Sequence, residues 1–202
     1  AVDGAKILNG SITSADLNAS LLNNTFWNLG GNAGTTPGTQ FLGTADNQPL
    51  ELKVNNQRGL RLEPTSSTDT VNVIGGSARN YAGGNVVGAT IGGGGTGNYA
   101  GLAHTNRVEA NFGTVSGGLG NTIQTNANLA TLGGGSENTI QTGALYATLG
   151  GGWQNTIQPY AYYATIPGGA QNSATSYAFA AGRQAKANHT GAFVWADSTV
   201  AD

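Results

Sequence analysis

The chain contains no cysteine and no methionine, and charged residues make up only 9% of its 202 residues. Without cysteine there is no disulfide, thiolate metal site or thiol redox chemistry, although this fixes no compartment. The formal net charge of −2 leaves no basic surface to hold phosphates, so nucleic acid is not expected as a partner. No run approaches the roughly 18 apolar residues of a membrane helix, so we expect no membrane span.

The start of the chain also lacks two common features. Its first residue is Ala1 rather than Met, and neither a basic region nor an apolar core of a signal peptide follows. We therefore expect a mature or excised fragment, with any anchor or export signal outside these residues.

Glycine, in contrast, is abundant and regularly placed. Of the 34 glycines, 26 fall between Asn72 and Val194. They recur within four copies of one unit, FGTVSGGLGNTIQ, LATLGGGSENTIQ, YATLGGGWQNTIQ and YATIPGGAQNSAT. The apolar anchors of these copies lie seventeen residues apart, at Val115, Leu132, Leu149 and Ile166. A period this short predicts a solenoid in which each coil has two short strands and stacks on its neighbours.

The period extends in both directions, with changes in length. Ile74 leads Ile91 by seventeen residues, and Ile91 leads Val115 by twenty-four, which predicts a seven-residue insertion around 101–107. Downstream, Ala180 and Val194 follow at fourteen-residue steps, so we expect the final coils to lose three residues from one turn. Eight coils result, and at about 4.8 Å per strand they make a rod roughly 38 Å long.

Within a coil, the alternation of side chains assigns faces. Leu132 and Ile140 are expected to meet inside the coil, while Thr131 points outward. An equally spaced asparagine follows each glycine run, and we interpret this row as a hydrogen-bonded structural ladder rather than a ligand row; its members are Asn121, Asn138, Asn155 and Asn172. The threonine rows leave ice binding as a minor alternative.

Two further segments precede the repeats. Residues 1–25 form an N-terminal segment in which Ser14 could cap a short helix containing Leu17, Leu21 and Leu22. In residues 26–70, Leu50, Leu52 and Val54 alternate with charges before an Asn-Asn-Gln turn and a second alternating run, which predicts a β-hairpin collar. We expect its leucine face to be buried and its charged face wet; the charged residues are Glu51, Lys53, Arg58, Arg61 and Glu63. Residues 71–202 then form the solenoid.

The thin interior of such a solenoid predicts association. One side chain per strand buries little area, while each glycine costs about 0.5 to 1 kcal/mol more ordering entropy than alanine. The outward rows of threonine, alanine and glycine suit a flat face packed against another copy. We infer an oligomer.

The repeats and the end of the chain together resemble a known family. The ATLGGGxxN coils, followed by SYAFAAGRQAKANHTGAFVWADS at fourteen-residue spacing, resemble the heads of YadA-type trimeric autotransporter adhesins and of related bacterial and phage fibres. The resemblance covers Asn72 to about Ser198. It implies an all-β fold, a left-handed parallel β-roll, a homotrimer, and a role in attachment at a cell surface or on a virion.

Catalysis and metal binding receive little support from the residues. Between Asn72 and Val194 no two carboxylates occupy matching positions of neighbouring coils, which argues against the paired acids of a glycosidase. His104 and His189 have no second ligand at metal spacing; His104 is expected to be solvated in the insertion, and His189 to brace a turn. We predict no enzyme activity, no catalytic residue, no cofactor and no metal site.

The aromatic residues are the best candidates for recognition. Trp153, Tyr160, Tyr162 and Tyr163 fall in two successive turns where neighbouring copies have smaller residues, so the coil core does not require them. Exposed aromatics stack on sugars or anchor proteins. The sequence supports equally well the alternative that Tyr162 and Tyr163 seal a trimer seam.

These observations favour a structural and adhesive segment of an extracellular trimeric fibre. Its expected partners are two further copies of the chain and a host glycan or matrix protein. A polysaccharide-depolymerising tail spike and a passive fibre spacer are the alternatives.

Overall fold

The computed structural model describes residues 11–16, 27, 30–67 and 69–197, in two units, Ala1–Thr44 and Ala45–Asp202. In the first unit, a 3-10 turn η2 spans Ser14–Asp16. The carboxylate of Asp16 accepts hydrogen bonds from the backbone N and the Oγ1 of Thr13, at 2.9 and 2.7 Å. Thr13, not Ser14, therefore holds the capping position. The rest of the expected helix, with Leu17, Leu21 and Leu22, lies outside the described residues.

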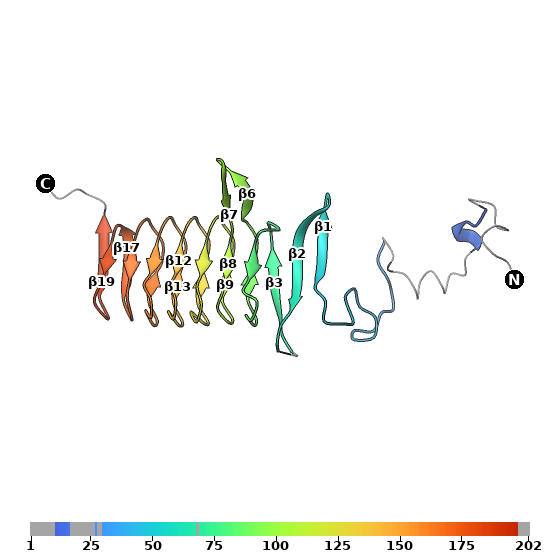
Figure 1. Cartoon of the computed structure of the whole chain (residues 1–202), viewed down its shortest axis with the longest axis horizontal. Coiled ribbons are helices and arrows are strands. Elements are labelled where there is room, and N and C mark those ends of the chain that lie inside the picture. Colours follow the sequence, from blue (N-terminus) through green and yellow to red (C-terminus); the bar gives the residue numbers. More distant parts are fainter. Residues whose placement is uncertain (1–10, 17–26, 28–29, 68, 198–202) are drawn as a thin grey trace. The chain divides into compact units, whose positions relative to one another are not determined.

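The second unit is an all-β solenoid of about seven turns, built from two sheets (Figure 1). Sheet A has ten strands, in the order β1-β2-β3-β5-β9-β11-β13-β15-β17-β19. Their bounds are β1 Leu50–Val54, β2 Gln57–Pro64, β3 Val71–Gly75, β5 Thr90–Ile91, β9 Thr114–Val115, β11 Thr131–Leu132, β13 Thr148–Leu149, β15 Thr165–Ile166, β17 Phe179–Arg183 and β19 Phe193–Asp197.

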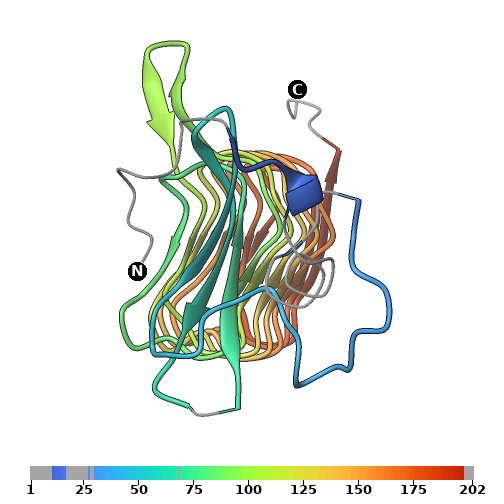
Figure 2. The same cartoon turned by 90° about the vertical axis from the view of Figure 1, so that its right-hand side faces the viewer.

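Sheet B has seven strands, in the order β18-β16-β14-β12-β10-β8-β4. Their bounds are β4 Tyr81–Ala82, β8 Arg107–Val108, β10 Thr122–Ile123, β12 Thr139–Ile140, β14 Thr156–Ile157, β16 Ser173–Ala174 and β18 Lys186–Ala187. Viewed along the stack, successive coils superpose (Figure 2). No helix in the described part of the chain has the length and apolar character that crossing a bilayer requires.

The strand register confirms the predicted anchors. Leu132 pairs with Val115 on one side and with Leu149 on the other, in parallel strands. Leu132 and Ile140 are both fully buried in one core, whereas Thr131 is exposed. The core is therefore a narrow stack of aliphatic side chains between the two sheets, as the alternation predicted.

The number and lengths of the coils differ from the prediction. All eight predicted anchors lie in stacked strands of sheet A, from Ile74 in β3 to Val194 in β19, but among the described residues no sheet B strand follows β19, so seven coils are complete. From Ile166 to Ala180 all three missing residues are lost from the return turn, as predicted, but in the last coil they are not lost from one turn. Ala180 to Ala187 and Ala187 to Val194 are each seven residues, against eight and nine in a full coil such as Val115 to Ile123 to Leu132.

The insertion is a second hairpin, and it is longer than the spacing suggested. Strands β6 (Thr96–Tyr99) and β7 (Leu102–His104) project from the stack (Figure 1). The range 96–104 is nine residues rather than seven. The difference arises because the later turn from Val108 to Val115 has seven residues where a full coil has nine.

The predicted asparagine ladder holds one corner of the coils together. Each ladder asparagine is buried, and its Oδ1 accepts the backbone N–H of the next; for Asn138 and Asn155 the distance is 2.9 Å. Its Nδ2 donates to two glycine carbonyls, such as Gly134 and Gly152 for Asn138. The ladder also includes Asn80 and Asn106, which the even spacing did not reveal.

The strands β1 and β2 pair antiparallel and add to β3, but their faces are opposite to those expected. Arg61 pairs with Ile74 and Glu63 with Asn72, so the charged residues continue the inner face of sheet A. The leucines continue the outer face, and Leu52 is 46% exposed. The alternation itself could not decide this, because only the register against β3 determines which face meets the core.

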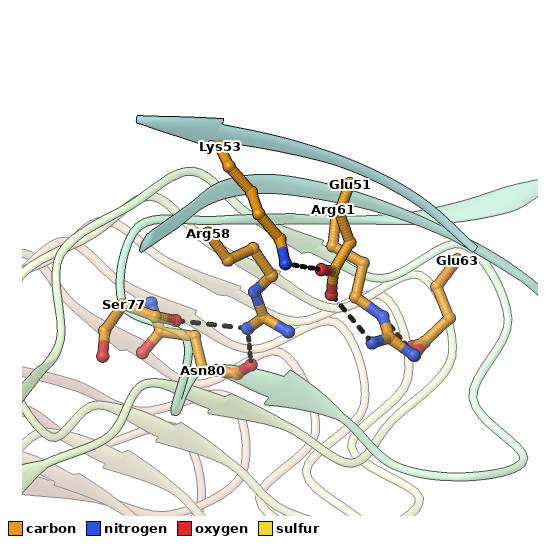
Figure 3. A network of polar contacts seen from close by, with 7 residues as sticks. All are labelled: Glu51, Lys53, Arg58, Arg61, Glu63, Ser77 and Asn80. Carbon is orange, nitrogen blue, oxygen red and sulfur yellow. Dashed lines mark hydrogen bonds and ion pairs between the residues drawn. The ribbon is translucent and has the colours of Figure 1, made fainter. Parts of the chain in front are cut away.

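The charged residues cover the first coil (Figure 3). Arg61 bridges Glu51 and Glu63 at 3.2 and 2.8 Å, and Lys53 lies 3.4 Å from Glu51. Partial burial raises the pKa of Glu51, but hydrogen bonds from Lys53 and Arg61 outweigh it and hold the pKa below its usual value.

Arg58 ends the stack of hydrogen bonds. Its Nη2 donates to the carbonyls of Ser77 and Asn80, at 3.2 and 2.7 Å. In the next coil, the carbonyl equivalent to that of Ser77 belongs to Gly94 and accepts from Asn80. The guanidinium thus takes the place of the ladder asparagine that a preceding coil would supply.

We expect the substitution Arg58→Met to lower the free energy of unfolding by about 1.5 to 3 kcal/mol, because two carbonyls lose a charged donor. Thermal unfolding followed by circular dichroism measures the change. The control is Arg79→Met, which removes an exposed guanidinium from the same coil. Equal melting temperatures for the two variants would contradict the capping role.

Candidate binding surfaces

The outer face of sheet A carries no charged residue over its first eight strands, from β1 to β15. Outward residues alternate with the buried anchors, and in the described strands none is charged until Arg183 and Asp197 at the ends of β17 and β19. The face begins with leucines and valines, continues with threonines, and ends with Phe179, Phe193 and Trp195. The threonines are Thr90, Thr114, Thr131, Thr148 and Thr165. A broad uncharged face of this kind is suited to protein contact.

A column of bulky side chains borders this face. One residue in each of five successive coils lies two positions before the outward residue of a sheet A strand, and is about half exposed: Phe112, Leu129, Tyr146, Tyr163 and Tyr177. All five have positive φ angles, between 55° and 61°. This backbone conformation costs roughly 1–2 kcal/mol for a residue with a side chain. Five such residues in a row indicate that something compensates for the strain.

Ring stacking supplies part of the compensation. The rings of Tyr146 and Tyr163 lie 4.9 Å apart and nearly parallel, at 6°, and those of Tyr163 and Tyr177 lie 5.4 Å apart at 23°. Such pairs contribute about 0.5–1.5 kcal/mol each. Because both faces of Tyr163 are covered, its ring has no face left to stack on a sugar.

The other two predicted tyrosines lie in the same turn with freer rings. A Cβ on Gly143 would come within 2.5 Å of the Tyr160 ring, so this tyrosine lies over a glycine of the preceding coil. Tyr160 is 62% exposed. Among the described residues no ring stacks on that of Tyr162, and its backbone N donates to the Oγ of Ser176.

Trp153 lies apart from the tyrosines. It occupies the turn from sheet A to sheet B, whereas the tyrosines occupy the return turn from sheet B to sheet A. Its neighbours in adjacent coils are Ser136 and Ala170, both joined to it by backbone bridges. The indole is exposed and stands between small side chains. The structure therefore divides the predicted cluster between two edges of the solenoid.

Sequence reasoning missed most of the bordering column. Phe112, Leu129 and Tyr146 repeat at seventeen residues, like the anchors, and Tyr177 follows Tyr163 at the fourteen-residue step of the final coils. The signal was present, but it was hidden because the identities change from Phe to Leu to Tyr.

Glutamine side chains on the surface of the solenoid form a second row of hydrogen bonds, separate from the asparagine ladder. Gln154 donates to Glu137 at 2.8 Å, and Gln171 and Gln184 extend the row on the exposed surface. His104 is largely buried rather than solvated, with its Nδ1 3.9 Å from Glu137 and its ring edge-on to that of Tyr99. Within the described part of the chain, no three His, Cys, Asp or Glu residues cluster in a way that could hold a metal ion.

No protein-family model, curated protein or solved structure matches this chain. The parallel β-solenoid is consistent with the β-roll that the sequence suggests. The likeness to trimeric adhesin heads remains an interpretation of the sequence.

Proposed function

We propose that this chain is a segment of a homotrimeric extracellular fibre, at a cell surface or on a virion, in which three left-handed rolls pack side by side and present a surface for attachment. The observation that carries the proposal is the outer face of sheet A, which is uncharged from β1 to β15. A face so broad and neutral, with Leu52, Phe193 and Trp195 exposed at its two ends, favours contact with another protein surface over water.

The hairpin supports the same arrangement. Its leucines lie on the outer face, and its charges are directed to the end of the core, so its apolar residues extend the face instead of closing the roll. We assign the β1–β2 hairpin as the collar of the trimer on this basis. The column ending in Tyr163 and Tyr177 borders this face, which favours the seam role for Tyr163.

Trp153 and Tyr160 are the residues we assign to adhesion. Each is exposed and adjoins small residues, Ser136 and Ala170 for the indole and Gly143 for the phenol, so a ligand can reach the ring. A host glycan or matrix protein would gain one to three kcal/mol from such a contact. Three copies would convert this weak contact into useful avidity.

The trimer is tested by sedimentation equilibrium at micromolar concentration, where we expect a mass three times that of the 20.3 kDa chain. Thr148→Glu places a carboxylate on the outer face of sheet A and should dissociate the trimer, because burying it three times is costly. Thr139→Glu, on sheet B, is the matched control and should leave the mass unchanged. A folded monomer of the parent chain, or equal masses for both variants, would refute this assembly.

Adhesion is tested on a glycan and matrix-protein array. We expect Trp153→Ala and Tyr160→Ala to preserve the trimer and to reduce binding at least about fivefold, as the loss of about one to three kcal/mol predicts. Tyr81→Ala, which removes an exposed ring from β4, is the control. If the parent trimer binds no ligand on the array, the passive spacer is favoured. If the alanine variants lose the trimer, Trp153 and Tyr160 belong to the contact between subunits.

A further inference from the structure

One return turn of the solenoid is shorter than the turns on both sides of it. From Val108 in β8 to Val115 in β9 there are seven residues. The turn before it, from Ala82 to Ile91, and the turn after it, from Ile123 to Leu132, each have nine. Within residues 71–197 no other short return turn lies between two full ones. The return turn of the second coil therefore extends less far outward than the return turns of the first and third coils.

A slot results at this edge, with a volume of about 460 Å³. Its walls are the turn residues 83–85 of the first coil and Thr125 and Asn126 of the third. Glu109 and Asn111 of the short turn lie between the walls, with Asn128 beside them. Because the walls belong to coils two steps apart, they are separated by roughly 9.6 Å. This volume is within the range of small-molecule sites.

The amides of the slot are held in place by the backbone. The Oδ1 of Asn111 accepts from the backbone N of Val87 at 3.0 Å, and the Oδ1 of Asn128 accepts from the backbone N of Asn111 at 2.9 Å. These bonds occupy the oxygens and leave both Nδ2 groups without a protein acceptor in the described part of the chain. Two preorganised donors therefore remain for a ligand.

The remaining groups determine the ligand class. Glu109 accepts hydrogen bonds, the lining of the slot contains no cation, and Arg107 is already paired with Glu109 at 3.5 Å. A phosphate or sulfate would therefore meet a carboxylate without a free cation. Gly84 faces open space, so a ring can approach its backbone closely. Fixed amide donors, a carboxylate acceptor and a glycine wall suit the alternating hydroxyls of a neutral sugar.

We propose that this slot binds one neutral pyranose ring, inserted where the second coil lacks two turn residues. Glu109 and the Nδ2 groups of Asn111 and Asn128 bind its hydroxyls, and Asn126 contributes from the wall. The site uses none of the aromatic residues assigned to adhesion, and it lies within one chain. It therefore does not depend on the trimer or on the attachment role proposed above.

The test is saturation-transfer NMR of the full chain with the methyl glycosides of glucose, galactose, mannose and N-acetylglucosamine at millimolar concentration. We expect transfer to at least one of the four. Inserting Thr-Asn between Glu109 and Ala110 copies the full turn of the third coil and should abolish the transfer. No transfer to any glycoside, or equal transfer with the insertion, would overturn the proposal.

A second variant protects the test against misfolding of the insertion. Asn126 has a φ of 60°, and the equivalent residue of the next coil is Gly143. Asn126→Gly therefore preserves the backbone conformation, and it should raise the dissociation constant for the glycoside at least tenfold. Thr125→Ala should also weaken binding, whereas Thr142→Ala, in the equivalent turn of the next coil and outside the slot, should leave it unchanged. Tyr160→Ala should leave monosaccharide binding unchanged, which separates this site from the adhesive surface. Unchanged binding for Asn126→Gly would contradict the site.

Discussion

The buried asparagine ladder is the constraint on which the rest of the solenoid depends. An amide in the core is costly unless all its groups are bonded. Here each side chain accepts one backbone N–H and donates to two carbonyls, as in Asn155, whose Nδ2 reaches Gly151 and Gly169. This pattern fixes the step between coils. It also requires glycine at the corner, because a Cβ on Gly135 would lie 2.1 Å from the carbonyl oxygen of Gly152.

Because the glycines and asparagines of the ladder tolerate so little change, most variation lies in the segments between them and in the return turns. The projecting hairpin Thr96–His104 ends just before the ladder residue Asn106, and the short turns lie on the return edge. The column of bulky side chains with positive φ angles and the slot beside Glu109 are on that edge too. The features that could support function are therefore found on the return edge, on the outer face of sheet A and, for Trp153, at an exposed position between a ladder glycine and its asparagine.

Much of this organisation was predictable from the sequence, and the misses have physical causes. The anchors and the ladder from Asn121 to Asn172 follow a constant period, so spacing alone revealed them. Asn80 and Asn106 escaped because an insertion separates them. The slot escaped because a gain of nine residues and a loss of two in one coil leave a net gain of seven over the seventeen-residue period. The hairpin faces escaped because alternation does not say which side meets the core.

The central claim is that a continuous ladder holds the coils in one register, and amide hydrogen exchange tests it most directly. Exchange of a buried, bonded amide requires opening of the structure around it. The account predicts that the backbone amides of Asn121, Asn138 and Asn155 exchange slowest in the chain and at similar rates. If they exchange as fast as the amide of Ala100, at the tip of the projecting hairpin, the ladder does not hold the stack together.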